Sequence, residues 1–177
     1  MRNQPAFPLV FSACVLALLA ACSPAHEWRQ VRAPKGSWVA LLPCKPTLEE
    51  RQVELQGRTW LWSLQACEVD GVRYALLSAT RTGSAPPSPT EALELASTWQ
   101  AAPVPSAQVS EWAWPRPARW PEGATWSPQR TRWTQGQQQG SVIMVHEGQL
   151  AQLSVTTPGP WPEAHLDTLH SGLAWQP

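Results

Sequence analysis

The segment RQVELQGRTWLWSLQACEVDGVRYALLSA, residues 51–79, contains three runs of strand-forming residues separated by two tight turns. The first run alternates apolar with charged side chains, and the turns are Gln56-Gly57 and Asp70-Gly71. Alternation with a period of two is typical of a half-buried strand, and Asp-Gly favours a hairpin turn. The sequence therefore predicts antiparallel strands over residues 51–55, 58–66 and 72–79.

A further strand is predicted just before this segment. Residues 37–42 are mostly apolar, and the run ends at Pro43 and Cys44. Together with the other three runs, this strand would complete a four-stranded antiparallel meander. The first and third strands of a meander run in the same direction, so Cys44 and Cys67 are expected at the same edge of the sheet.

A second hairpin is predicted near the C-terminus. Strands over residues 141–146 and 149–156 flank the turn Glu147-Gly148. In this register four apolar side chains share one face, which we assign to the core. They are Val142, Met144, Ala151 and Leu153.

Two helices are predicted. A capping box of Ser88, Pro89 and Glu91 starts the first after a loop over residues 81–89. Its apolar stripe consists of Ala92, Leu93, Ala96 and Trp99, and Pro103 and Pro105 stop it. The second covers residues 162–171, with Leu166 and Leu169 facing inward and Gly172 at its end. The predicted fold class is α+β: an antiparallel sheet, made of the meander and the second hairpin, with two helices packed on one face.

The segment between residues 111 and 133 mixes tryptophan, arginine and proline. Proline excludes a long helix or a central strand, so we expect a sheet edge and an extended loop over the core, with tryptophans inward and arginines outward. The alternative is a recognition surface, because tryptophan and arginine dominate interface hot spots. The residues of that candidate surface are Trp112, Trp114, Arg116, Arg119, Trp120 and Trp126, with Trp133 completing the five tryptophans of the segment.

The N-terminus has the features of a secretory signal. Arg2 precedes an apolar run over residues 7–19, which is shorter than the ~20 residues of a membrane-spanning helix. The run closes with Leu19-Ala20-Ala21-Cys22. This ending resembles the lipobox of bacterial lipoproteins, whose signal peptide is cut before a cysteine that carries diacylglycerol.

That resemblance implies lipidation of Cys22 and a lipid anchor in the membrane; a secreted form without lipid is the alternative. Ser23 after the cysteine favours the outer membrane over the inner membrane. The domain organisation expected is a cleaved signal peptide (1–21), a lipidated N-terminus and tether (22–35) with an edge strand near residues 28–32, and a single periplasmic domain (36–177).

Four cysteines fit this compartment. Cys14 belongs to the leader and Cys22 would carry lipid, which leaves Cys44 and Cys67 as a pair in an oxidising environment. Their predicted position at one sheet edge agrees with a disulfide. Redox or metal chemistry is the alternative, although the pair has no CxxC spacing and no accompanying ligand cluster.

Composition excludes some functions. The formal net charge is +0 without a basic block, which argues against nucleic-acid binding. The chain contains 12 tryptophans, and both phenylalanines lie in the leader. Tryptophan therefore either replaces phenylalanine in the core or forms a platform for sugars or cations.

No catalytic motif is recognisable. The sequence contains no nucleophile elbow, HExxH, Walker loop or dinucleotide-binding glycine pattern. The four histidines (His26, His146, His165 and His170) are interpreted as solvated surface residues, and Glu49-Glu50 as a solvated loop pair. We expect no enzyme activity, no cofactor and no metal.

Two sequence segments, Leu42-Pro43-Cys44-Lys45-Pro46 and residues 66–76 (ACEVDGVRYAL), resemble a group of small proteobacterial lipoproteins with two cysteines. This resemblance implies the lipid anchor and the cysteine pair, but no activity. The order of strands and helices also resembles PsbP/Mog1-like folds, which implies an accessory or binding role.

The function expected from the sequence is that of a non-enzymatic, membrane-anchored accessory module that binds an envelope protein partner through the surface around Trp112. The alternative is a lipoprotein that binds a small ligand or glycan with a surface lined by tryptophan and arginine.

Overall fold

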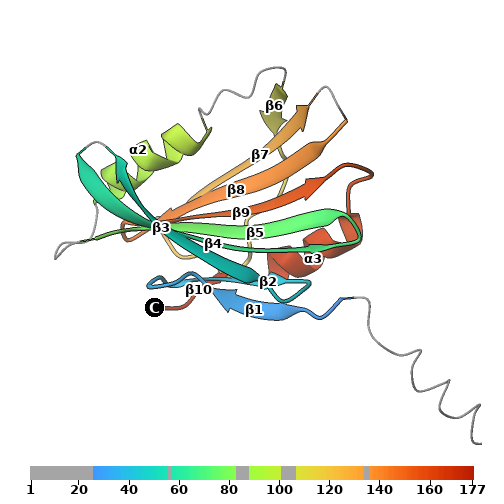
Figure 1. Ribbon diagram of the computed structural model, residues 1–177, viewed down its shortest axis with the longest axis horizontal. Coiled ribbons are helices and arrows are strands. Elements are labelled where there is room, and N and C mark those ends of the chain that lie inside the picture. Colours follow the sequence, from blue (N-terminus) through green and yellow to red (C-terminus); the bar gives the residue numbers. More distant parts are fainter. Residues whose placement is uncertain (1–25, 56, 83–87, 101–106, 134–135) are drawn as a thin grey trace, which may run out of the picture.

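Antiparallel β-sheet dominates the computed structural model, which describes residues 26–55, 57–82, 88–100, 107–133 and 136–177 (Figure 1). Within those residues the strands form one seven-stranded and one three-stranded sheet. The order across the large sheet is β3 (Thr47–Leu55), β4 (Arg58–Val69), β5 (Val72–Arg81), β9 (Gln149–Thr157), β8 (Gln138–His146), β7 (Thr125–Trp133) and β6 (Ala107–Glu111).

The small sheet covers one face of the large one. It consists of β1 (Arg29–Arg32), β2 (Trp38–Leu42) and β10 (Ala174–Trp175), with β2 in the middle. Helix α3 (Glu163–Ser171) packs on the same side, and the main core lies between these elements and the large sheet. This core takes Val142 and Met144 from β8, together with Tyr74 from β5 and Trp38 from β2.

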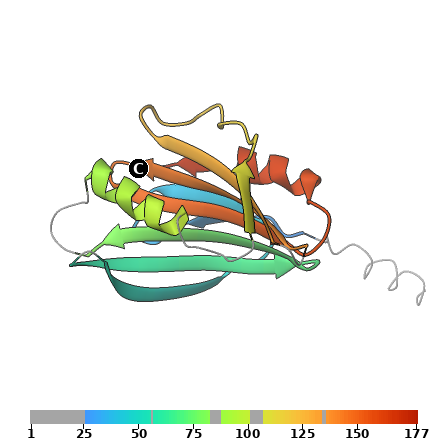
Figure 2. The same cartoon turned by 90° about the horizontal axis from the view of Figure 1, so that it is seen from above.

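Helix α2 (Pro89–Gln100) covers part of the opposite face of the large sheet. Its Ala92, Leu95 and Ala96 pack against a second cluster that contains Ile143 and Val145. Figures 1 and 2 show α2 and α3 at separate places on the molecule rather than side by side.

The predicted α+β class with two helices on one face is therefore wrong. The fold is mostly β, and the two short helices lie on opposite faces of the large sheet. The physical reason is visible in β8, where residues 142–145 are apolar at every position. Alternate side chains of a strand point to opposite faces, so this run requires cover on both sides.

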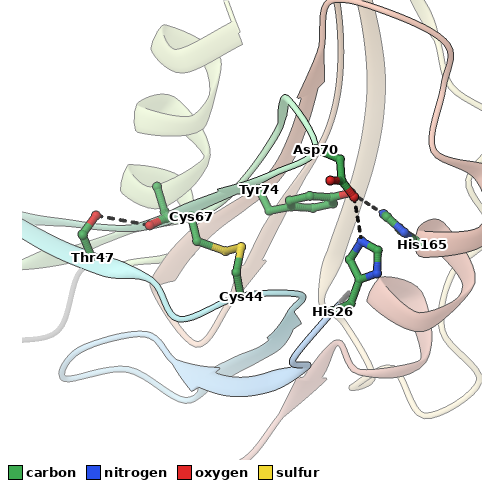
Figure 3. The surroundings of a disulfide bond; sticks show 8 residues. His26, Cys44, Thr47, Cys67, Asp70, Tyr74 and His165 are labelled. Carbon is green, nitrogen blue, oxygen red and sulfur yellow. Dashed lines mark hydrogen bonds and ion pairs between the residues drawn. A yellow bond between two sulfur atoms is a disulfide. The ribbon is translucent and has the colours of Figure 1, made fainter. Parts of the chain in front are cut away.

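The predicted four-stranded meander is also wrong in one strand. Strands β3, β4 and β5 pair as predicted, but the preceding strand β2 belongs to the small sheet. The disulfide prediction is confirmed: Cys44, just after β2, is bonded to Cys67 in β4, with their Cα atoms 5.9 Å apart. The bond therefore joins the two sheets instead of two strands of one sheet (Figure 3).

Several local predictions are confirmed. The Ser88 amide donates to Glu91 Oε2 (2.6 Å), and the Glu91 amide donates to Ser88 Oγ (3.3 Å), which forms the capping box. The second hairpin has the predicted register, since Val142 lies opposite Leu153 and Met144 lies opposite Ala151. Leu166 and Leu169 of α3 are buried.

Other predictions fall outside the described part of the chain. These include the leader with Cys14, Cys22 and Ser23, residues 83–87 of the predicted loop, and the helix-stopping Pro103 and Pro105. The side chains of Leu93, Trp99 and Trp133 are outside it as well. The helices that are described include none with the length and hydrophobicity needed to cross a membrane.

Candidate functional site

Seven tryptophans form a continuous series of ring contacts on the face of the large sheet that also carries α3. We call this series the tryptophan chain, and its neighbouring ring centroids lie 4.4–5.7 Å apart. In order, its members are Trp161, Trp112, Trp114, Trp126, Trp120, Trp38 and Trp175. Edge-to-face and offset contacts at these distances favour a fixed packing arrangement.

Four of the five predicted tryptophans belong to this chain and pack against the core, while the side chain of Trp133 is outside the described residues. Trp114 is 7% exposed, while Trp112, Trp120 and Trp126 are half-buried. The indole N–H of Trp126 donates to the Trp114 carbonyl (2.9 Å). These rings are therefore mainly structural, in agreement with the predicted inward tryptophans. The expectation that proline excludes a central strand here is wrong, because β7 contains Pro128 and pairs with both β6 and β8.

Arg116 and Arg119 are exposed on the segment between β6 and β7. The chain at Pro115 lies against α3, because its carbonyl is 2.9 Å from Nε2 of His170. The structure thus brings Arg116 and Arg119 to the solvent side of the segment whose tryptophans face the core.

Two arginines of β7 border the neighbouring strand β6. Arg130 donates to Gln138 Oε1 (2.7 Å) and lies over the Trp161 ring, 4.9 Å from its centroid. Arg132 shares the same Gln138 oxygen at 3.5 Å. Nε of Arg130 is buried without a hydrogen-bond partner. Among the described residues, neither guanidinium has a carboxylate within ion-pair distance, and the Gln138 amide accepts hydrogen bonds from both without neutralising their charge.

Strand β6 is one outer edge of the large sheet. Its residues 108–111 are exposed, and Val109 is 60% exposed. The other outer edge is β3, where Leu48 is 54% exposed. The two edges differ in charge, because β3 contains Glu49, Glu50, Arg51 and Glu54, whereas β6 contains only Glu111.

Two hollows lie beside β6. One, of about 510 Å³, is lined by Gln108, Val109 and Ser110 together with Arg130 and Arg132. The other, of about 460 Å³, lies where β6 ends, between residues 109–112 and residues 126–129. We call β6, the adjoining part of β7 and residues 112–120 the β6–β7 corner.

A smaller hollow of about 320 Å³ lies over β3, β4 and β5, and the sequence did not indicate it. Trp62, Leu64 and Leu77 line it, together with Glu49, Glu50 and Arg51. An aromatic ring beside carboxylates and a guanidinium can bind a small polar ligand.

A cluster of titratable side chains joins three distant segments. His26 precedes β1, Asp70 lies in the β4–β5 turn, Tyr74 in β5 and His165 in α3 (Figure 3). His26 Nε2 is 3.6 Å from Asp70 Oδ2, and the rings of His26 and His165 lie 4.3 Å apart. The Tyr74 hydroxyl is hydrogen-bonded to Nδ1 of His165.

Burial controls the protonation of this cluster. It raises the pKa of Tyr74 to about 12, and the Asp70 carboxylate acts in the same direction. Burial lowers the pKa of His165 from 6.5. The neighbouring His26 lowers it further, and Asp70 opposes this shift. At neutral pH both side chains are therefore uncharged, and their hydrogen bond fastens α3 to β5, while the ring of His26 joins the start of the domain to α3.

The interpretation of the histidines as solvated surface residues is wrong. All four are half-buried and contact other side chains or the backbone. No sequence pattern indicates this arrangement, because His26, Asp70 and His165 are far apart along the chain. In the described part of the chain, no group of three or more histidine, cysteine, aspartate or glutamate side chains has an arrangement suited to a metal ion.

No model of a known protein family matches the chain, and no curated protein is detectably similar to it.

Proposed function

We propose that this protein is a lipid-anchored module of the bacterial envelope that binds a protein partner through the β6–β7 corner and catalyses no reaction. The observation that carries the proposal is the corner itself. It combines an exposed apolar side chain on a sheet edge, two hollows, and arginines that have no carboxylate partner among the described residues. A sheet edge with unpaired backbone groups and few charged side chains is a ready template for pairing with another chain.

The lipid anchor is part of the proposal and rests on the lipobox at Cys22. His26 is four positions after Cys22, and a fully extended chain of four steps spans at most ~14 Å. The cluster at His26 and strand β1 would then hold the domain close to the membrane surface. The outer membrane is the proposed location, because Ser23 follows the cysteine.

The composition of the corner supports a protein partner. Arginine and partly exposed tryptophan are enriched at interface hot spots. Arg116, Arg119 and Arg132 are exposed there, and Trp112 and Trp126 border one hollow. Truncation of Trp114 would test stability rather than binding, since this ring is buried. Reversal of surface charge is therefore the better perturbation.

A small ligand or glycan is the second candidate, favoured by the hollow beside Trp62. Its volume of about 320 Å³ lies at the lower end of the range for ligand sites. Titration with peptidoglycan fragments, followed by tryptophan fluorescence, tests this candidate. A saturable change that disappears in an Arg51→Ala variant would support it over a protein partner.

Formaldehyde crosslinking in living cells, followed by affinity purification and mass spectrometry, tests the main proposal. The variants are Arg116→Glu/Arg119→Glu at the corner and Arg51→Glu/Arg73→Glu as a matched control. All four arginines are exposed, so both variants should fold. We expect one envelope protein to be captured by wild type and control, and its recovery to fall at least fivefold in the corner variant.

Equal recovery with both variants would place the contact elsewhere and refute the assignment of the corner. Absence of any captured protein in wild-type cells would refute partner binding itself.

A further inference from the structure

We propose that β6 receives an extended, acidic segment of the partner as an added strand of the large sheet. This inference rests on the proposed function and specifies how the β6–β7 corner would recognise its partner. Strand addition supplies affinity through backbone hydrogen bonds and specificity through alternate side chains.

The two outer edges of the large sheet, β3 and β6, differ in how many charged side chains they carry. Proteins protect edge strands from pairing with other chains by placing charged side chains on them. Four of the nine residues of β3 are charged, and Glu50 and Glu54 are hydrogen-bonded to Ser63 and Thr59. Strand β6 instead exposes Gln108, Val109 and Ser110, and carries a single charge at its end. Only the β3 edge therefore has this protection.

Arg130 and Arg132 of β7 lie beside β6 on one face of the sheet. In the β6–β7 register Ser110 lies opposite Arg130, and Gln108 lies opposite Arg132, so these four side chains share one face. The hollow of about 510 Å³ lies over the same group. A strand added outside β6 would lie ~5 Å from it and direct every second side chain toward this face.

The charges beside β6 favour an acidic partner segment. Glu111, the acidic residue of β6, lies opposite Gln129 and therefore on the other face of the sheet. Within the described part of the chain, the guanidiniums of Arg130 and Arg132 have only the Gln138 amide as a side-chain acceptor, and Nε of Arg130 has no acceptor there. Carboxylates at alternate positions of an incoming strand would provide the missing counter-charge. A basic or uncharged strand would not.

A photo-crosslinking experiment in cells tests this mode of binding. The photoreactive residue replaces Val109 on β6 in the full chain, or Leu48 on β3 as the control, because these side chains have similar exposure. We expect position 109 to crosslink to one segment of a partner protein that carries aspartate or glutamate at alternate positions. Position 48 should yield at least tenfold less of this product.

The charge requirement is tested with Arg132→Gln, which removes the charge of an exposed side chain, and with the double variant Arg130→Gln/Arg132→Gln. We expect the crosslinking yield at position 109 to fall about two- to fivefold in the single variant and further in the double variant. Thermal unfolding of each variant serves as the folding control, and the single variant remains informative if the double variant is unstable.

Other results would overturn the inference. Crosslinking of position 109 to a second copy of this chain would show self-association instead, and a segment without acidic residues would remove the charge argument. A partner captured by formaldehyde but not from position 109 would refute strand addition while leaving the proposed function intact. No captured partner in either experiment would refute both.

Discussion

Replacement of Gly140 by alanine tests whether the tryptophan chain is a packed core. Gly140 lies in β8, and a Cβ atom built there would lie 2.6 Å from Trp112 Cζ3 and 2.6 Å from Trp161 Cζ2. Ordinary carbon contacts are ~3.5–4.0 Å, so both rings would have to move by about 1 Å. Gly140 does not adopt a positive φ, and the backbone therefore accepts alanine without strain.

The magnitude follows from three contributions. Overpacking of a core costs about 1–3 kcal/mol. Displacement of Trp161 also weakens its contact with the Arg130 guanidinium, worth about 0.5–1 kcal/mol. Loss of unfolded-state entropy on replacing glycine offsets about 0.4–1 kcal/mol. We expect Gly140→Ala to lower the free energy of unfolding by about 1–3 kcal/mol.

Gly159→Ala is the matched control. Its Cβ would meet no atom within 4 Å, and its φ is not positive. The backbone contribution is then common to both variants and cancels in their difference, which we expect to be about 1.5–4 kcal/mol.

Urea unfolding followed by far-UV circular dichroism measures this difference, and near-UV dichroism reports the tryptophan contacts. Free energies of unfolding that agree within about 0.5 kcal/mol, with an unchanged near-UV spectrum, would refute tight packing around Gly140.

Four further predictions follow from the cluster, the disulfide and the anchor. Above pH 10 the unfolded chain loses the Tyr74 proton, whereas the folded chain keeps it until about pH 12. The free energy of unfolding should therefore decrease across this window by about 2–3 kcal/mol. Urea titrations in this pH range can check this, and a Tyr74→Phe variant should lack the dependence. Because the pKa of His165 is lowered in the fold, the unfolded chain binds its proton first as pH falls through 6.5, and stability should decrease there; a His165→Gln variant should have a flatter profile. Cys44→Ala/Cys67→Ala should lower the free energy of unfolding by about 3 kcal/mol, the chain-entropy value for a separation of 23 residues. A loss below about 1 kcal/mol, measured by denaturant unfolding, would contradict this prediction. Cys22→Ala should release the protein from the outer membrane or retain its precursor in the inner membrane, and normal fractionation of this variant would refute lipid anchoring.

The sequence predicted features set by neighbouring residues. The hairpin of β8 and β9, the capping box at Ser88 and the inward residues of α3 each depend on a short pattern, and the structure confirms them. The strand after the tether was also recognised, because its apolar residues are contiguous. Its assignment to the meander is wrong, because this strand, β2, pairs with β1 and with β10, which are distant from each other in the sequence.

The candidate site was predicted only in part. The mixture of proline, tryptophan and arginine after residue 111 indicated inward rings and outward arginines, as found for Trp114 and Arg116. The exposed edge at Val109 was missed because its exposure depends on β6 pairing with β7 alone. The cluster of His26 with His165 was missed because only the packing of α3 beside β5 brings these residues together.

Binding of the purified partner to the full-length protein is the most direct test of the proposed corner. Biolayer interferometry would compare wild type with Val109→Glu on β6 and Leu48→Glu on β3, which add the same charge to the two sheet edges. We expect at least tenfold weaker binding by Val109→Glu and unchanged binding by Leu48→Glu. Equal affinities for all three proteins, or a greater loss with Leu48→Glu, would contradict it.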